Sequence, residues 1–459
     1  MPASAPNLLL VVLDSARVDR LGCYGHPEMS TPNIDALAAE GVRFANCISE
    51  STWTLPSAFT ILTGLSPREH RAELHRKLPA EMATLPALLE QAGYATFGSI
   101  GNSWVGGRTG LRRGLARFHQ PVSHWRVLEP VMRNVIQPLG LADAPGAGMV
   151  AAFQRWARRA REPWFGLLWI QDSHHPYLCP RPFVQQFHPR PLPRRRLLDL
   201  AQKMRRPRHF AATATTQDHD DLARLCSGAT AHVDRLVGRL ADGLARGRRA
   251  EETLLVVTAD HGDMLGEHGL VGHGPAGGVY QPLIHVPLVV RGPGFAGGAV
   301  APGLVQLADV TQTLATVAGA AERLAPTAAE RMTLQQALAG NGRAAAVCER
   351  ERLSDKRLHR EQAEAPTYDF TPFDCHLAAV IADGWKLIAR DPGPHELYHL
   401  AADPQEQHNL LDQHPRQAEA LRQMLADMHG RSAPHPATDG LSLDDSEVVD
   451  RRLRDLGYL

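Results

Sequence analysis

The chain has 459 residues, of which 44% are hydrophobic, so it is long enough for one large α/β domain and a smaller one beside it. Its 49 basic and 49 acidic residues cancel, which excludes a global field that would attract nucleic acid or an anionic membrane. No basic stripe is interleaved with aromatic residues. We therefore expect neither nucleic-acid nor membrane partners, and the oligomeric state stays open.

The N-terminal stretch MPASAPNLLLVVLDSARVDR has only six consecutive strongly apolar residues, from Leu8 to Leu13. No basic segment precedes them, and six residues are too few for a signal sequence or a membrane span. The six cysteines are scattered without a Cys-x-x-Cys pair, which argues against a zinc knuckle or a dense disulfide framework. These features predict a cytoplasmic protein with reduced thiols.

Short apolar runs bounded by turn residues alternate with amphipathic stretches over residues 1–325. The runs include NLLLVVLD, WFGLLWIQD, ETLLVVTADHGD and HVPLVVRG, and AHVDRLVGRLADGLARG is one of the helical patterns between them. Continuous apolar runs followed by helices are typical of parallel strands that are buried on both faces. The pattern predicts an α/β fold with a doubly wound, mostly parallel sheet flanked by helices, which forms the larger domain.

The pattern changes in residues 326–459. An Ala-rich helical stretch, TAAERMTLQQALAG, is followed by short strand patterns around HLAAVIADGWKLIAR and HELYHL, and then by a helix near HPRQAEALRQMLADM. We expect a smaller C-terminal α+β subdomain with terminal helices, packed on the main sheet.

A basic, proline-rich insertion occupies residues 188–210 and reads HPRPLPRRRLLDLAQKMRRPRHF. A charge run of this kind is usually a solvated face or a mobile loop. The alternative is a lid that contributes arginines to an anionic substrate. The sequence leaves both interpretations open.

The stretch ESTWTLPSAFTILTG, residues 50–64, places Thr54 at the start of an apolar helix. One interpretation is that Thr54 is an N-cap and that Pro56 lies where helices tolerate proline. The other is that Thr54 is a nucleophile, because a helix N-terminus also stabilises developing negative charge on its oxygen. The rest of the chain decides between them.

Polar side chains follow three of the predicted strands. Asp14 ends the first run, Asp172 and His174 follow FGLLWIQ, and Asp260 and His261 follow TLLVVTA. Ligands of doubly wound sheets bind beyond the carboxyl ends of the strands, so these are candidate site residues. The glycines of TADHGDMLGEHG let the backbone pass close to a ligand. Two carboxylates with one imidazole favour Mn²⁺, Mg²⁺ or Ca²⁺ over a thiolate zinc site.

Several longer motifs occur in order along nearly the whole chain. They are LLLVVLDSARVDRLGCYG, STPNIDALAAEGVRFANCIS, TWTLPSAFTILTG, GNSWVGGRTGLRRGLARF, DSHHPY, VVTADHGDMLGEHGLVGHG, VPLVVRGPG, GWKLI and ELYHLAADPQEQHNL. In these motifs the sequence resembles the sulfatase-like branch of the alkaline phosphatase superfamily. The resemblance implies an alkaline phosphatase-like fold and hydrolysis of a small-molecule anionic ester.

The resemblance also implies one divalent metal ion, which is Mn²⁺, Mg²⁺ or Ca²⁺, with Zn²⁺ as a further alternative. Asp14, Asp260 and His261 match the family positions that bind this ion. Thr54 matches the nucleophile and, as an alkoxide, would contact the same ion.

Three other residues match family positions near the transferred group. His174, in SHHPY, matches a histidine that contacts the substrate anion or assists the leaving group. His273, in GLVGHG, stands where many sulfatases have a lysine and would be a second cationic or proton-donating group. Asn102, in GNSW, matches a polar substrate-binding position of related phosphonate and phosphodiester hydrolases. The alternative for each histidine is a structural, hydrogen-bonded role.

The sequence departs from the sulfatase pattern at three positions. Sulfatases oxidise a cysteine or serine to formylglycine, whereas Thr54 carries a methyl group on the same carbon and would give a ketone. We therefore expect no formylglycine. Ala58 replaces the arginine that supports formylglycine, and Ser15 replaces a second aspartate, which reduces the number of acidic ligands.

These observations favour a metal-dependent hydrolase that cleaves a phosphate monoester, a phosphate diester or a phosphonate ester through Thr54, with His174 or His273 protonating the leaving group. The alternatives are a sulfuric ester hydrolase that acts without formylglycine, a phospho-group transferase, and a non-catalytic family member. A non-catalytic protein has no physical reason to keep a buried charged cluster, which costs desolvation energy. The sequence does not identify the substrate.

Overall fold

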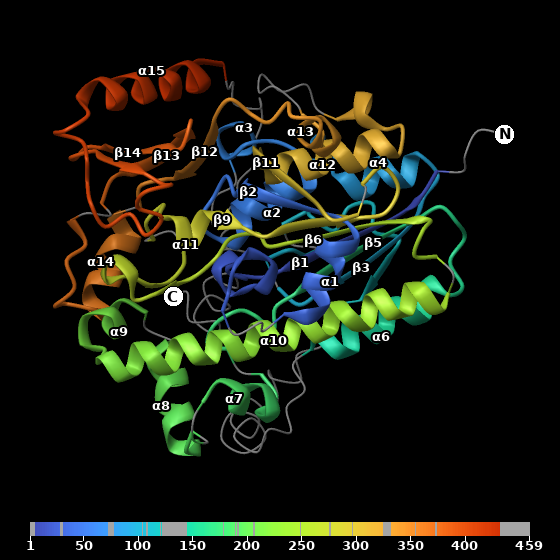
Figure 1. Cartoon of the computed structure of the whole chain (residues 1–459), viewed down its shortest axis with the longest axis horizontal. Helices are drawn as coiled ribbons and strands as arrows, with labels where there is room; N and C mark the ends of the chain where they lie inside the picture. The colour runs from blue at the N-terminus through green and yellow to red at the C-terminus, as the bar shows by residue number, and fades with distance from the viewer. Residues whose placement is uncertain are drawn as a thin grey trace.

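A computed structural model of the protein contains two main β-sheets, shown in Figure 1. The model describes residues 5–27, 31–71, 78–102, 104–106, 109–119, 121, 145–177, 179–188, 190, 192–204, 207–247, 249–274, 277–295, 297–324, 332–353, 355–371 and 374–431. The predicted fold class is confirmed, because a mostly parallel sheet lies between helices and a small antiparallel sheet follows it in the chain.

The larger sheet has nine strands among the described residues. They are β1 (Asn7–Leu13), β2 (Val42–Ile48), β3 (Ala95–Ile100), β4 (Arg117–His119), β5 (Trp164–Ile170), β6 (Thr253–Thr258), β9 (His285–Val286), β10 (Leu288–Arg291) and β11 (Ala299–Gln306). The order is β11-β2-β10-β6-β1-β5-β3-β4, and β9 pairs with β2. The central strand β1 runs parallel to β5 and β6, and all of its residues are buried. This burial on both faces explains the continuous apolar run NLLLVVL.

One strand runs in a direction that the sequence pattern did not predict. The run HVPLVVRG was expected to form a parallel strand, but β10 is antiparallel to both β6 and β2. Between β6 and β10, the described residues of the connection form three two-residue strands and two helices, each of a single turn. A parallel return needs a crossover long enough to span the sheet, usually a helix, so here the chain turns back beside β6.

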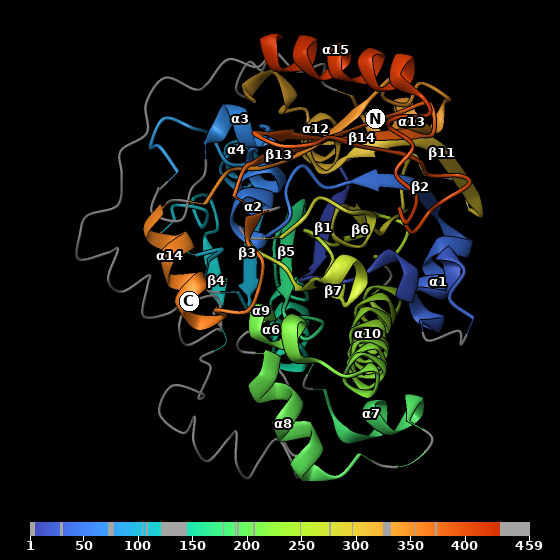
Figure 2. The ribbon, with the colours of Figure 1, turned by 90° about the vertical axis from the view of Figure 1, so that its left-hand side faces the viewer.

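Helices cover both faces of the larger sheet (Figures 1 and 2). One layer is α1 (Pro32–Glu40), α6 (Gly146–Ala157) and α10 (Thr216–Arg246), and the other is α2 (Thr54–Thr63), α3 (Pro67–His70), α4 (Leu85–Gln91), α12 (Leu307–Val317) and α13 (Leu334–Leu338). Within the described residues, no helix is both long and apolar enough to span a bilayer.

The smaller sheet is antiparallel, and α15 packs on it. Its elements are β12 (Ala346–Arg350), β13 (His376–Ala382), β14 (Trp385–Asp391), β15 (Glu396–His399) and α15 (Pro415–Arg431), with α14 (Asp355–Glu364) between β12 and β13. A buried ion pair joins Lys386 Nζ to Glu406 Oε1 at 2.5 Å. The other oxygen of Glu406 accepts a hydrogen bond from the backbone N–H of Gln281 in α11 (Gln281–Ile284) at 2.6 Å. This contact fixes the smaller sheet to the loop that follows β6.

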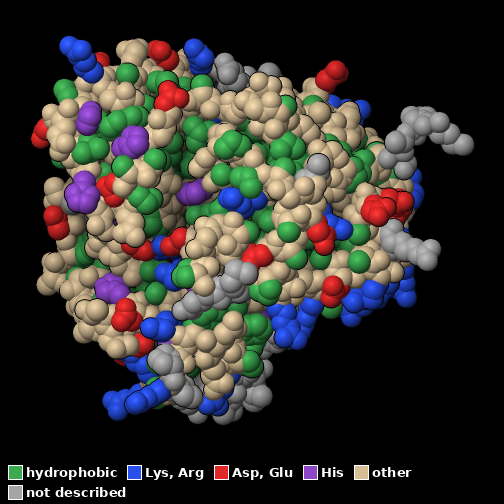
Figure 3. All heavy atoms as spheres, viewed as in Figure 1, with side chains coloured by type: hydrophobic (Ala, Val, Ile, Leu, Met, Phe, Trp, Pro, Cys, Tyr) green, Lys and Arg blue, Asp and Glu red, His purple; other side chains and the backbone are tan. Residues whose placement is uncertain are grey.

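The basic insertion contains α8 (Arg194–Met204) and α9 (Pro207–Thr213), and α7 (Arg181–Phe187) precedes them. Figure 3 shows Lys and Arg side chains along the lower edge of the molecule, where α6, α8 and α10 lie. Arg196 forms ion pairs with Asp218 and Asp221 of α10, each at 2.7 Å, and Lys203 lies 3.1 Å from Asp218. These two cations hold the insertion against the first turns of α10.

Candidate active site

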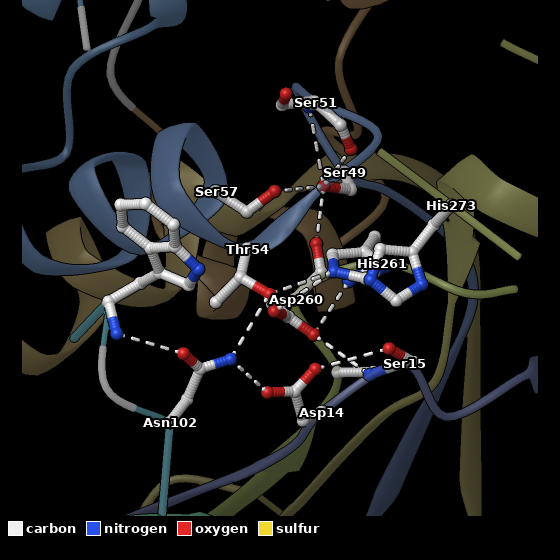
Figure 4. A network of polar contacts seen from close by, with 12 residues as sticks. Asp14, Ser15, Ser49, Ser51, Thr54, Ser57, Asn102, Asp260, His261 and His273 are labelled. Atoms are coloured by element: carbon white, nitrogen blue, oxygen red, sulfur yellow. Dashed lines mark hydrogen bonds and ion pairs between the residues drawn. The ribbon is translucent and has the colours of Figure 1, made fainter. Parts of the chain in front are cut away.

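The candidate residues meet at the carboxyl ends of the central strands, as the sequence predicted. Asp14 follows β1, Asn102 follows β3, Asp260 and His261 follow β6, and Thr54 is the first residue of α2. All five are at least 99% buried. Figure 4 shows their side chains pointing toward one another. The parallel arrangement of β1, β3 and β6 causes this convergence, because parallel strands end at the same edge of the sheet.

The Thr54 hydroxyl does not cap α2. Trp53 occupies the N-cap position with extended backbone angles, and no side chain caps the helix. Thr54 Oγ1 instead lies 3.2 Å from His261 Nε2 and 3.4 Å from Asn102 Nδ2. The helix ends at Gly64, whose φ of 71° suits a left-handed C-cap. The local sequence therefore places a helix N-terminus at the site, and residues from distant parts of the chain, His261 and Asn102, surround the hydroxyl.

Two serines hold the first turn of α2 against the loop after β6. Ser49 Oγ donates a hydrogen bond to the carbonyl oxygen of Asp260 at 2.6 Å. It also lies 3.2 Å from Ser57 Oγ in the helix. Both serines are fully buried. Their contacts restrict the movement of Thr54 relative to Asp260 and His261 (Figure 4).

The two carboxylates of the cluster differ in their hydrogen bonds, because both oxygens of Asp14 accept at least one and only one oxygen of Asp260 does so. Asp14 Oδ2 accepts from Asn102 Nδ2 at 2.6 Å, and Asp260 Oδ1 accepts from the backbone N–H groups of Ser15 and His261 at 3.1 and 3.0 Å. Asp260 Oδ2 is buried and accepts no hydrogen bond from the described residues. A buried carboxylate oxygen of this kind is expected to have a partner, and here a cation would provide it.

His261 is oriented as a metal ligand. Its Nδ1 lies 2.7 Å from the carbonyl oxygen of Gly262, which can only accept, so Nδ1 holds the proton. The lone pair is therefore on Nε2, which lies 3.3 Å from Asp260 Oδ2. One ligand atom from each of Asp14, Asp260 and His261 lies within 4.8 Å of the others. This donor set fits one divalent cation with a preference for oxygen ligands.

The electrostatics of the cluster also favour a cation. Burial, together with the negative charge of Asp14, raises the pKa of Asp260 to about 7. Two carboxylates in one buried site repel each other when both are ionised. A bound divalent ion removes this repulsion by neutralising both charges.

A second cluster, the histidine cluster, contains His174, His175 and His273, and lies beside the first. Its ring centroids are 4.2 to 4.9 Å apart, and His273 also lies 4.3 Å from His261. One nitrogen from each of the three histidines lies within 4.8 Å of the others, so these residues form a second group that could hold a metal ion. The structure thus brings His174 and His273 together with the predicted metal ligands.

Asp263 organises the histidine cluster. Its Oδ1 accepts from His273 Nδ1 at 3.1 Å, and its Oδ2 lies 3.3 Å from His175 Nδ1 and accepts from the Tyr177 hydroxyl at 2.5 Å. Burial alone would raise the pKa of this carboxyl, but His273 and His175 hold it well below its usual range. Asp263 is therefore an ionised carboxylate with both oxygens satisfied.

The histidines of this cluster are poorly solvated, and burial lowers their basicity. Burial and the adjacent His175 lower the pKa of His174 to about 4, and burial and His261 lower the pKa of His273 well below its usual range. His174 Nδ1 donates to the carbonyl oxygen of His175 at 2.6 Å. In the metal-free, substrate-free protein, His174 and His273 are therefore neutral at pH 7.

Sequence reasoning missed Asp263 and His175. Both lie inside motifs that were identified, TADHGD and DSHHPY, next to residues that were chosen. Asp263 follows Asp260 by three residues, so the signal was present, but only the loop geometry shows that the two carboxylates face different clusters. Ser15 supports the site in another way, because its hydroxyl donates to Asp14 Oδ1 at 3.1 Å.

Comparisons with known proteins give the following matches. The sequence model of the family described as Sulfatase matches residues 6–320. The "Uncharacterized sulfatase YidJ" of Escherichia coli (strain K12) is 25% identical over 441 residues, which cover 89% of this chain and 83% of that protein. The steryl-sulfatase of Mus musculus is 28% identical over 528 residues, which cover 95% of this chain and 84% of that protein.

A solved structure shows the same fold. The phosphonate monoester hydrolase of Agrobacterium radiobacter superposes with a TM-score of 0.72 at 23% sequence identity, over 93% of this chain and 96% of that chain. Both sheets of the chain therefore belong to an arrangement that other proteins share.

Proposed function

The chain belongs to the sulfatase family and is an ester hydrolase, and we propose that it cleaves a phosphate monoester, a phosphate diester or a phosphonate ester with Thr54 as the nucleophile. The observation behind this proposal is the position of Thr54 Oγ1, 3.2 Å from His261 Nε2 in the carboxylate cluster. The methyl group on the same carbon prevents oxidation to an aldehyde. A covalent phospho-threonine, in contrast, needs only the hydroxyl.

The first step replaces the leaving group by Thr54. Thr54 Oγ1 releases its proton to solvent and bonds to phosphorus, and the bond from phosphorus to the leaving oxygen breaks. A divalent cation held by Asp14, Asp260 and His261 would lower the pKa of the hydroxyl and offset charge on the nonbridging oxygens. The N-terminus of α2 adds a favourable dipole. Asn102, 3.4 Å from Thr54 Oγ1, orients the hydroxyl and the transferred group.

The leaving oxygen takes a proton from the histidine cluster. We assign this role to His273. In the free protein its ring is neutral, with the proton on Nδ1 toward Asp263, and it takes a second proton on Nε2 when the anionic ester binds beside it. Asp263 stabilises this imidazolium form, which donates from Nε2. His174, beside it, contacts the substrate anion. Water then bonds to phosphorus and returns a proton to His273. The bond from phosphorus to Thr54 Oγ1 breaks, and this oxygen takes back a proton from solvent, which restores the hydroxyl.

Hydrolysis of a sulfuric ester without formylglycine is the second candidate. The relatives named as sulfatases favour it, since the same cluster can address a tetrahedral sulfur centre. Transfer of the phospho group to an alcohol would use the same covalent threonine. Thr54, Asp14 and Asp260 have the same positions in each of these reactions, so substrate and acceptor must be tested directly.

The test is turnover of matched nitrophenyl esters by the purified protein with Mn²⁺, Mg²⁺, Ca²⁺ or Zn²⁺. The panel contains 4-nitrophenyl sulfate, 4-nitrophenyl phosphate, bis(4-nitrophenyl) phosphate and 4-nitrophenyl phenylphosphonate. We expect a phosphorus ester to turn over, Thr54→Ala to be inactive and Thr54→Ser to keep measurable activity. Thr63→Ala is the control, because it removes another buried hydroxyl of α2. This hydroxyl donates to the carbonyl oxygen of Phe59 and accepts from the backbone N–H of Leu65, at the opposite end of the helix from Thr54.

Two outcomes would contradict the proposal. Turnover of the sulfate ester alone would show that the site acts on sulfur without formylglycine. Turnover of a phosphorus ester by Thr54→Ala at the wild-type rate would remove Thr54 from the reaction. Product transfer to an added alcohol in excess of hydrolysis would identify a transferase.

A further inference from the structure

Arg208 differs from the other cations of the basic insertion. It lies in α9 and is 5% exposed. Its Nη1 donates one long hydrogen bond, to the carbonyl oxygen of Val271 at 3.5 Å, and it forms no ion pair with the described residues. Arg196 and Lys203, in contrast, are both paired with carboxylates of α10.

A buried guanidinium group without a carboxylate is energetically unfavourable. Removing the charge from water is unfavourable, and buried arginines are normally paired or fully hydrogen-bonded. Arg208 has five N–H donors and a single weak acceptor among the described residues, and the small part of its side chain that is exposed includes its other guanidinium nitrogens. An anion from outside the chain would provide the missing acceptors for the guanidinium group.

Arg208 lies next to the hairpin that leads to His273. The hairpin consists of β7 (Met264–Leu265) and β8 (Val271–Gly272). Val271, which accepts the hydrogen bond from Arg208, is only two residues, or about 7 Å of extended chain, from His273. A side chain at Gly272 would place its Cβ 3.3 Å from Pro207 Cβ, so α9 packs directly on β8. Arg208 is therefore at the side of the site where the leaving group is protonated.

A second buried arginine increases the positive potential at this place. Arg350, at the end of β12, is 2% exposed and donates to the carbonyl oxygens of Glu351 and Cys375 at 3.1 and 3.0 Å. Burial and the nearby charges of Arg208 and Arg390 lower the pKa of Arg350 to about 10. Arg390 is neutralised by Glu396. An anion beside Arg208 would relieve the remaining repulsion between Arg208 and Arg350.

We propose that Arg208 binds a second anionic group, located on the leaving-group part of the substrate. The preferred substrate is then an ester whose leaving alcohol bears a carboxylate, phosphate or sulfate group. This inference rests on the proposed function, because it uses His273 to define the leaving-group side. According to this inference, Arg208 of the basic insertion determines the specificity for the leaving group.

The experiment compares two esters of the reactive class, 4-nitrophenyl and 3-carboxy-4-nitrophenyl. The measured quantity is the ratio of their kcat/KM values, which cancels general effects of a substitution. The wild type should have a higher kcat/KM for the carboxylated ester than for the plain ester. We expect Arg208→Gln to lower the ratio of these two values, carboxylated over plain, by about 10- to 100-fold, which corresponds to the loss of a charge-assisted hydrogen bond. Arg208→Lys should restore part of the preference for the carboxylated ester, mainly by lowering the KM of that ester. Arg195→Gln, an exposed cation of α8, is the matched control and should leave the ratio unchanged.

An unchanged ratio in Arg208→Gln would overturn the inference. An equal fall in the ratio for Arg195→Gln would also overturn it, because it would indicate only a general electrostatic field.

A binding measurement separates this inference from the proposed function. In Thr54→Ala, calorimetric titration with 3-carboxy-4-nitrophenol should give tighter binding than 4-nitrophenol, and Arg208→Gln should remove the difference. If no ester turns over but this difference is present, the proposed function fails and the anion site stands. If no difference is present, the anion site fails.

Discussion

Two aspartates in the loop after β6 show how one residue type serves two purposes. Asp260 and Asp263 are three residues apart, and both are completely buried. Asp260 faces Asp14 and keeps one oxygen without a hydrogen bond from the described residues, and its pKa rises to about 7. Asp263 binds two histidines and a tyrosine, and its pKa falls well below the usual range.

The comparison teaches that burial alone does not determine the state of a carboxylate. Desolvation raises the pKa in both cases, but only Asp263 has donors that reverse the effect. Asp260 is therefore prepared for a cation, and Asp263 is already satisfied within the chain. The first aspartate belongs to the carboxylate cluster with Thr54, and the second fixes the histidines on the leaving-group side.

The largest expected effect comes from Asp260→Asn. The substitution removes one of two carboxylates from the metal-binding group, so we expect loss of the bound metal and a fall in kcat of at least about 10³-fold, since metal ions contribute several kcal/mol of transition-state stabilisation. Metal content by mass spectrometry and kcat are the measurements. Asp234→Asn is a control, because Asp234 is also buried but accepts a hydrogen bond from the backbone N–H of Ile34 in the first turn of α1. Retention of the metal by Asp260→Asn would contradict the assignment.

Asp263→Asn should separate the two clusters. We expect kcat to fall by about 10²-fold, within the range for positioned proton transfer, while the metal content stays at the wild-type value. The loss should grow for esters with less acidic leaving alcohols, since these depend more on protonation by His273. A rate loss that is the same for all leaving groups would argue against a proton-donating role.

The stability of the metal-free protein should depend on pH through Asp260. The folded carboxyl holds its proton up to about pH 7, whereas the unfolded one releases it near its ordinary value of 3.8. The folded state therefore binds more protons between these values, and the free energy of unfolding contributed by this group should decrease as the pH rises from about 4 to 7. Denaturation at several pH values should show this slope in the wild type and a weaker one in Asp260→Asn. An equal slope in both proteins would refute it.

Tyr177→Phe should give the smallest effect. It removes one of the three donors to Asp263, the hydroxyl at 2.5 Å, and leaves both histidine contacts. We expect a loss of about 1.5 to 3 kcal/mol in the free energy of unfolding, as for a hydrogen bond to a charged group, and less than about a tenfold change in kcat. Tyr94→Phe removes a neutral contact to Pro6 and serves as the reference. A rate loss as large as that of Asp263→Asn would give Tyr177 a direct role in the reaction.

The fold class and the convergence of polar residues at the strand ends follow from the sequence pattern alone. NLLLVVL and TLLVVT are apolar throughout because both faces of the sheet are covered, and this pattern is visible without coordinates. Asp14 and Asp260 follow these runs directly. Their convergence needed only the rule that parallel strands end at one edge. The roles of these residues in catalysis stay predictions.

Tertiary structure decided what local sequence cannot encode. The direction of β10 depends on how the chain turns after β6, and the Thr54 hydroxyl points to His261 because the loops from three strands surround it. Asp263 could not be distinguished from Asp260 in TADHGD, since their difference lies in partners that are far away in the chain. Arg208 likewise resembles every other arginine of the insertion until its burial is known. In each case the deciding quantity is the set of neighbours that folding brings to a charged or polar group.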